Sequence, residues 1–273
     1  MLPIRTMVAG WAMASAVATA SPIPAVRLTP ESIAGWERYL GATELRIARE
    51  MGAGDRFLAH DFAADGAAHR RTLIGGAVVV EPLTTVDRTG TPIEVPNAMV
   101  HHWRGGVFIP GVRLNDLMAR LHDGPPAGRQ QEDLLDSRVL SRGRDQMNVY
   151  LKLQRTKIVT VVYNTEHDVR FKRQGPTRAS STSTATKIAE IDNPGDAVER
   201  ELPQGDDSGY MWRWNSYWRY EEVPGGVIAE CESVSLSRDV PGVVRALAGP
   251  IIRSTASESM ERTLLALRER HKR

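Results

Sequence analysis

Hydrophobic and polar residues alternate most clearly between Gly209 and Arg238, where two strand-like runs flank the turn Val223-Pro224-Gly225-Gly226. Alternating runs on either side of such a turn predict a β-hairpin. If Val223 pairs with Gly226, one face sets large rings opposite small side chains, and the other sets opposite charges across the ladder. The expected pairs are Trp218–Cys231, Ser216–Ser233, Trp214–Ser235 and Trp212–Ser237 on the first face, and Arg219–Glu230 and Tyr217–Glu232 on the second, which also carries Arg213 and Asn215. Neither face resembles an ordinary apolar core, so we expect this hairpin to form the wall of a ligand site.

The N-terminal part of the chain predicts one helix and one strand ahead of the main domain. Thr29-Pro30 is typical of a helix start, and apolar residues then recur on one face as far as Met51. A buried strand is expected within residues 72–81, which contain Ala77-Val78-Val79-Val80. Residues 55–70 give no clear pattern.

From residue 98 onward the pattern predicts a strand, a short helix and an antiparallel meander. The expected strands cover residues 98–109, 134–141, 146–155, 158–171 and 178–191, and the short helix covers residues 114–121. A turn at Thr156-Lys157 would place Tyr150 opposite Tyr163. The Ser- and Thr-rich run in 178–191 could be low-complexity sequence, but threonine on a half-exposed strand fits it better.

The C-terminal region predicts helix in two pieces. A short helix is expected to break at Gly249-Pro250, because an interior proline removes a backbone hydrogen bond. A second helix is expected to begin at the capping box Thr255–Glu258.

Composition favours a globular protein and excludes several classes of site. The chain has 273 residues, 41% of them hydrophobic and 25% charged, and a formal net charge of +2, which is too small to indicate a nucleic-acid-binding surface. Its one cysteine, Cys231, rules out an intrachain disulfide and any cysteine-rich metal site, and we expect it to be a buried, inert thiol.

Residues 1–20 have the features of a secretory signal peptide. Arg5 precedes a short apolar run that ends at the small-residue motif Ala18-Thr19-Ala20. The run is too short for a comfortable membrane span. We expect cleavage of this peptide, export to a bacterial periplasm and no stable membrane span afterwards. The alternatives are that the segment is an uncleaved membrane anchor or that the start codon is misassigned.

Few residues suggest catalysis, and no catalytic or nucleotide-binding motif is present. Of the neighbours His101 and His102, only one can face a cavity, because adjacent strand residues point to opposite faces. That histidine could act as a base or hydrogen-bond a ligand, or both could be structural. The histidines and aspartates between Asp55 and His69 lack a compact ligand spacing, so we expect no metal site and no cofactor.

Three segments together resemble the START-like (SRPBCC, helix-grip) superfamily, which includes polyketide cyclase-like proteins. GGVFIPGVRLNDLMARLHD is similar to its opening strand and helix, DLLDSRVLSR to the strand after its helical insert, and WRWNSYWRYEEVPGGVIAECESVSLSRDVP to its last hairpin before the gripping helix. The resemblance implies an α+β fold, in which a curved antiparallel sheet grips a long C-terminal helix around an apolar cavity. The expected organisation is a signal peptide at 1–20, an N-terminal extension at 27–97 packed on the main domain, and a START-like domain at 98–273. The extension could cap the cavity mouth or form a dimer contact.

These observations lead to one functional hypothesis and two alternatives. The first is non-catalytic binding or carriage of a hydrophobic small molecule or lipid. The second is a cavity-based cyclase, dehydratase or hydrolase that uses a His, Tyr or Glu. The third is an interaction module without a ligand. The candidate ligand-binding residues are Arg213, Asn215, Tyr217, Arg219, Glu230, Glu232, Trp212, Trp214, Trp218, His101, His102, Tyr150 and Tyr163.

Overall fold

The computed structural model describes residues 28–126, 133–156, 160–203, 205–239 and 242–271, except for the side chains of 242–255. The elements in chain order are α1 (Pro30–Met51), the 3-10 helix η1 (Ala59–Phe62), α2 (Gly66–Ile74), β1 (Val79–Pro82), β2 (Ala98–Pro110), α3 (Leu114–His122), β3 (Leu134–Arg142), β4 (Gln146–Thr156), β5 (Thr160–Arg173), β6 (Arg178–Asp192), β7 (Arg200–Glu201), β8 (Arg213–Val223), β9 (Gly226–Arg238) and α4 (Gly242–His271). Among the described residues, no helix combines the length and the apolar character that crossing a membrane would need.

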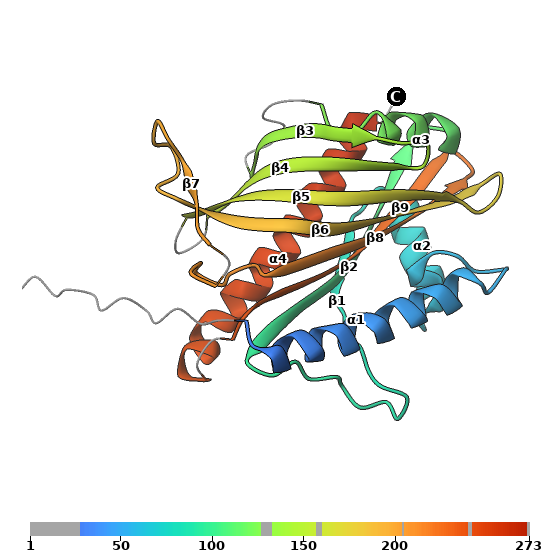
Figure 1. Ribbon diagram of the computed structural model, residues 1–273. Helices are drawn as coiled ribbons and strands as arrows, with labels where there is room; N and C mark the ends of the chain where they lie inside the picture. Colours follow the sequence, from blue (N-terminus) through green and yellow to red (C-terminus); the bar gives the residue numbers. More distant parts are fainter. Residues whose placement is uncertain (1–27, 127–132, 157–159, 204, 240–241, 272–273) are drawn as a thin grey trace, which may run out of the picture.

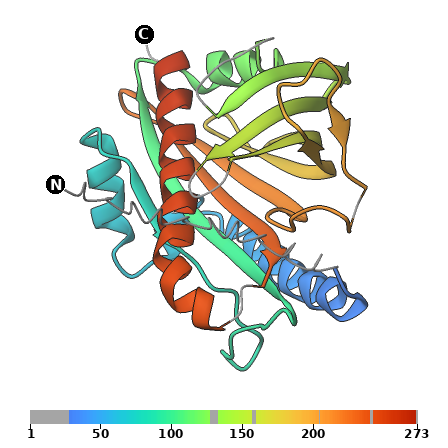
Figure 2. The same ribbon diagram turned by 90° about the vertical axis from the view of Figure 1, so that its left-hand side faces the viewer.

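The strands form one curved antiparallel sheet in the order β1-β2-β9-β8-β6-β5-β4-β3, with β7 paired to β6. Figures 1 and 2 show α4 along one side of this sheet and α1 along the other. We call the side toward α4 the inner face and the side toward α1 the outer face. This is the α+β helix-grip arrangement expected from the sequence.

The register of the β8–β9 hairpin follows the sequence prediction. Val223 pairs with Gly226, and the ladder then joins Trp218 to Cys231 and Arg219 to Glu230. Gly225 has a φ of +88°, a left-handed conformation that favours glycine in this turn. Because a two-residue turn fixes the register, all the large-to-small pairs within the strands fall where they were expected.

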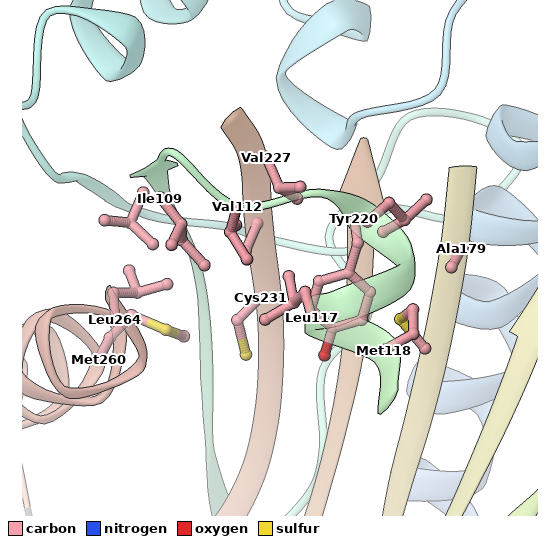
Figure 3. Packing of buried hydrophobic residues seen from close by; sticks show 13 residues of the cluster. Ile109, Val112, Leu117, Met118, Ala179, Tyr220, Val227, Cys231, Met260 and Leu264 are labelled. Carbon is pink, nitrogen blue, oxygen red and sulfur yellow. The ribbon is translucent and has the colours of Figure 1, made fainter. Parts of the chain in front are cut away.

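The inner face is the one that carries the tryptophan–cysteine pair. Met260 and Leu264 of α4 belong to one buried cluster with Cys231, and Figure 3 shows the three side chains gathered beside β9. Gly105 of β2 lets the helix approach, since a Cβ at this position would lie 2.7 Å from a Leu264 methyl carbon. The helix therefore packs on small residues of β2 and β9.

The outer face is covered by the N-terminal extension. Thr29 caps α1 by accepting a hydrogen bond from the Ser32 amide at 3.2 Å, and the buried stripe of α1 includes Trp36, Tyr39 and Ile47. This stripe packs on apolar side chains of β8 and β9, in a cluster that holds Val95, Trp212, Tyr217, Val234 and Leu236. Helix α1 thus lies on the side of the sheet opposite α4, whereas β1 joins the edge of the sheet and Val78 and Val80 pack against the cluster that contains Met260 and Leu264 of α4.

The β4–β5 hairpin differs from its predicted register by three residues. Tyr150 pairs with Glu166, and Tyr163 pairs with Leu153, so the predicted Tyr150–Tyr163 pair is wrong. Thr156 pairs with Thr160, and the connection falls on residues 157–159, which lie outside the described residues. The prediction assumed a shorter turn, and any error in turn length moves every pair of the ladder.

Two further predictions are wrong. The expected strand at 72–81 is only β1, because residues 66–74 form α2 and pack Leu73 against the outer face. The expected break at Gly249-Pro250 is absent, since α4 runs from Gly242 to His271. An interior proline costs a helix one hydrogen bond but does not have to end it. The capping-box residues 255–258 consequently lie inside α4.

Candidate functional site

The inner face carries a row of serines that begins at a tryptophan. Trp103 of β2 pairs with Ser233 of β9, Ser233 with Ser216 of β8, and Ser216 with Ser183 of β6. Paired residues of an antiparallel sheet point to the same side, so these four side chains share the inner face. Serine side chains are short, so this row adds little bulk to the inner face.

Aromatic rings border this row of serines on the same face. Trp214 lies two residues before Ser216 in β8, on the same face. Its indole nitrogen donates a hydrogen bond to Ser233 Oγ at 2.9 Å. Trp218 lies on the other side, opposite Cys231. We call the following set the inner wall: His101, Trp103, His167, Ser183, Trp214, Ser216, Trp218 and Ser233.

Several of these large side chains are only half-buried, although they face the gripped helix. Trp103, Trp214 and Trp218 all retain accessible surface, whereas Val107 of β2 and Ala229 of β9 are fully buried. The tight packing of α3 and α4 therefore covers one end of the inner face and leaves aromatic surface at the inner wall. An apolar ligand could cover that surface.

His167 is the polar side chain of the inner wall that sequence reasoning missed. Its ring lies edge-on to Trp214, with centroids 5.0 Å apart, and its Nε2 is 3.0 Å from Thr165 Oγ1. Its Nδ1 is 3.3 Å from Ser183 Oγ. Burial lowers the pKa of His167 to about 4, so the imidazole is neutral near pH 7. The sequence pattern predicts a strand around His167, but it does not identify which side of that strand faces inward.

The two neighbouring histidines point to opposite faces, as predicted. His101 is on the inner face, where its Nε2 is 2.8 Å from Ser237 Oγ, and burial lowers its pKa to about 4. His102 is on the outer face, where its Nδ1 is 2.9 Å from the Tyr39 hydroxyl and its Nε2 is 2.8 Å from a Glu232 oxygen. Of these two histidines, His101 is therefore the one that can belong to a site between the sheet and α4.

The charged residues predicted on the second face of the hairpin lie beneath the extension. Arg219 donates to Glu50 of α1 at 2.6 Å and to the Phe57 carbonyl at 3.0 Å. Glu230 accepts hydrogen bonds from the Ala59 amide and contacts His60 Nδ1. Arg219 and Glu230 are thus opposite each other in register, but each is bonded to the extension. This face is not exposed to solvent at these positions, because the two side chains are 3% and 1% exposed.

The remaining outer-face candidates join the same buried network. Glu232 contacts Arg46 of α1 as well as His102, and the Tyr217 hydroxyl donates to Glu44 at 2.7 Å. Burial alone would raise the pKa of Glu232, but the His102 hydrogen bond and the Arg46 charge outweigh it and lower that pKa to about 2. Burial, together with the bond to Glu44, raises the pKa of Tyr217. The hydrogen bond with His102 and the charge of Arg46 therefore keep Glu232 ionised, although it is buried beneath α1.

The five other predicted ligand-binding residues do not gather at one place in the structure. Asn215 donates to Thr184 Oγ1 at 3.4 Å on the outer face, and Arg213 donates to the Trp212 carbonyl at 2.9 Å. Trp212 precedes β8 and packs with the α1 cluster, so its predicted place on the face of Trp214 is wrong. Of the two tyrosines, Tyr150 donates to Asn164 Oδ1 at 2.7 Å, and Tyr163 is buried.

Two hollows lined by described residues lie away from the inner wall. One, of about 390 Å³, is lined by Ile74, Gly75, Gly76, Phe108, Pro110, Arg268 and Glu269. The other, of about 370 Å³, is lined by Arg120, Asp123, Gly124, Pro125, Pro126, Arg270 and His271. Neither contains a predicted ligand-binding residue. An enclosed cavity at the inner wall therefore stays a prediction.

No protein-family model and no curated protein matches the sequence. Among solved structures, a STAR-related lipid transfer protein fragment from Xanthomonas axonopodis is similar at 13% identity and a TM-score of 0.40, covering 67% of this chain and 98% of its own. Human StAR-related lipid transfer protein 5 is similar at 13% identity and a TM-score of 0.39, covering 88% and 100%. The Zhui aromatase/cyclase from Streptomyces sp. R1128 is similar at 13% identity and a TM-score of 0.34, covering 63% and 93%.

At this level of similarity the neighbours do not identify a ligand or a reaction for this chain. The fold is defined by the elements themselves: a curved antiparallel sheet, a short helix after its first long strand, and a long C-terminal helix along its inner face. The chain has an α+β helix-grip fold.

Proposed function

We propose that this protein binds a hydrophobic small molecule, lipid-like or polyketide-like, against the inner wall, without covalent chemistry. The observation that carries the proposal is the half-buried surface of Trp103, Trp214 and Trp218 beside a row of serines. Covering apolar surface is favourable by about 2.5 kcal/mol for each 100 Å². Rings at the border and small side chains in the middle provide that surface together with space for a ligand.

Polar groups of the inner wall would orient one end of such a ligand. His101 and His167 are both neutral near pH 7, because burial lowers the pKa of each to about 4. Neutral imidazoles can donate or accept a hydrogen bond without holding a buried charge. A ligand with an apolar body and one hydroxyl or carbonyl group fits this combination.

The catalytic alternative has less support from the geometry. It requires an inward-facing histidine bonded to a second ionisable group. His101 contacts the Ser237 hydroxyl, and His167 contacts the hydroxyls of Thr165 and Ser183. The histidine that does contact a carboxylate, His102, lies on the outer face beneath α1. Binding therefore accounts for the inner wall with fewer assumptions than catalysis does.

We also propose that the protein acts after export. This part of the proposal depends on the signal-peptide features of residues 1–20, which lie outside the described residues. Amino-terminal sequencing of protein recovered from the periplasm of an expressing bacterium tests it. Cleavage after Ala20 is the expected result, and retention of an intact N-terminus in the cytoplasm would contradict it.

Native mass spectrometry of the exported protein tests ligand binding. We expect extra mass that organic extraction removes, and uptake of lipids or polyketide-like compounds by the extracted, refolded protein. Far-ultraviolet circular dichroism of the extracted sample confirms that the fold is intact. A single mass equal to that of the polypeptide before extraction, with no uptake afterwards, would contradict the proposal.

A further inference from the structure

Three metal-binding side chains from separate elements meet at the edge of the outer face. His60 comes from η1, His69 from α2 and Glu81 from β1, and their ligand atoms all lie within 4.8 Å of one another. His60 Nε2 is 3.5 Å from a Glu81 carboxylate oxygen. The two imidazole rings lie at 82° with their centroids 5.0 Å apart. The fold therefore brings together two histidines and a carboxylate that the sequence separates.

Each histidine has one nitrogen beside a carboxylate and one without a hydrogen-bond partner in the described structure. His60 Nδ1 contacts Glu230, and its Nε2, in a side chain only 1% exposed, has no such partner. His69 Nε2 is 3.2 Å from an Asp65 oxygen, and its buried Nδ1 likewise has none. A buried nitrogen without a partner is costly. A ligating histidine, however, commonly donates its second N–H to a carboxylate in this way.

We propose that His60, His69 and Glu81 bind a divalent transition-metal ion, with Glu230 orienting His60. Two imidazoles and one carboxylate suit zinc or iron(II). Ligand atoms of tetrahedral zinc lie about 3.3 Å apart, given bonds of about 2.0 Å. The 3.5 Å between His60 and Glu81 is close to this spacing. The buried Nδ1 of His69, which makes no hydrogen bond among the described residues, is the atom we assign to the metal, with water at the open position.

The charges around the cluster suit a divalent cation. Glu81, Glu230 and Asp65 supply three carboxylates, and Arg104 supplies one guanidinium, so two formal negative charges are left. Arg104 donates to one oxygen of Glu81, at 2.5 and 3.0 Å. The 3.5 Å distance from His60 Nε2 ends at this same oxygen, so Arg104 competes with a metal for it.

A metal at this point would link the extension to the sheet. Its ligands belong to η1, α2 and β1, and Glu230, which holds His60, belongs to β9. Gly106 of β2 provides room for His60, since a Cβ there would lie 3.3 Å from its ring carbon Cε1. We expect binding to stabilise the packing of residues 59–81 on the outer face.

The test is calorimetric titration of tag-free, chelator-treated protein with Zn²⁺, together with the visible spectrum of the Co²⁺-loaded protein. We expect one ion per chain, cobalt bands of a four- or five-coordinate site, and a rise in Tm on adding Zn²⁺. His69→Gln and Glu81→Gln should each weaken binding by at least about 100-fold, beyond the 10–100-fold typical for loss of an outer-sphere partner. His122→Gln, on α3, is the matched control and should bind like the wild type.

Either of two results would overturn the proposal. One is that wild-type protein takes up no stoichiometric Zn²⁺ or Co²⁺, in which case His60 is only an ion-pair partner of Glu230. The other is that His69→Gln binds as tightly as His122→Gln. Because His69 is partly exposed on a short helix, its substitution should leave the fold intact, which circular dichroism can verify.

Discussion

Arg219 and Glu50 form an ion pair of 2.6 Å between side chains that are 3% and 11% exposed. Arg219 projects from the outer face of β8, and Glu50 lies in the last turn of α1, 169 positions away in sequence. This pair defines the role of the outer face, because its charges are neutralised by the N-terminal extension instead of by solvent or a ligand.

Glu50→Gln should destabilise the protein by about 3 kcal/mol, because it leaves the buried Arg219 guanidinium without a counter-charge. Urea denaturation with an unchanged m-value measures the loss. Glu37→Gln, on the exposed side of the same helix, is the control and should change stability by less than about 0.5 kcal/mol. Equal effects of the two substitutions would show that the ion pair does not hold the extension.

Tyr39→Phe should cost about 1–2 kcal/mol, because two buried groups lose a partner. The hydroxyl lies 2.9 Å from His102 Nδ1 and accepts from the Thr85 amide at 3.0 Å. Tyr210→Phe removes a hydroxyl from a side chain that is 42% exposed and should be nearly neutral. Thermal unfolding of both variants checks the prediction, which fails if Tyr39→Phe is as stable as the wild type.

Glu232 should make the outer face sensitive to acid. Its pKa is lowered to about 2 in the folded protein from an ordinary value of 4.5, so its contribution is fully present above pH 4.5 and is lost as the pH falls toward 2. Relative to Glu232→Gln, the wild type should lose about 3 kcal/mol of stability over that range. Denaturant titrations between pH 7 and pH 2.5 measure the difference. A constant difference would mean that Glu232 titrates normally.

Cys231 should be unreactive in the native state. It is 3% exposed on the inner face, and burial raises the pKa of its thiol, so little thiolate forms near pH 8. Ellman's reagent should label the protein only after unfolding, with one equivalent per chain because this is the single cysteine. Rapid labelling of native protein would require the inner face beside α4 to open.

The sequence allowed the hairpin at 209–238 to be predicted well because its turn is short and its alternation strict. Val223 and Gly226 set the register, and the remaining pairs within the strands follow from the period of two. The β4–β5 hairpin lacks such a turn, and the predicted position of Tyr150 was accordingly wrong by three residues.

The elements that cover each face of the hairpin, and the side chains they contribute, could not be predicted in the same way. Alternation shows that Arg219 and Trp218 point to opposite sides, but it does not identify which element covers either side. Those partners come from distant sequence, as Glu50 does for Arg219 and Glu230 does for His60. The grouping of His60, His69 and Glu81 could not be predicted for the same reason, since Glu81 lies outside residues 55–70.

The most direct measurement of ligand binding at the inner wall compares two phenylalanine substitutions on β6. Ser183 faces the inner wall, whereas its neighbour Thr182 is exposed on the other side of the strand. Titrating each protein with a dansyl-labelled fatty acid measures affinity by fluorescence. Ser183→Phe should fill the space beside Trp214 and weaken binding by at least about 10-fold, the equivalent of 1.4 kcal/mol, while Thr182→Phe should bind like the wild type. Equal affinities for all three proteins, or no binding by the wild type, would contradict a ligand site at the inner wall.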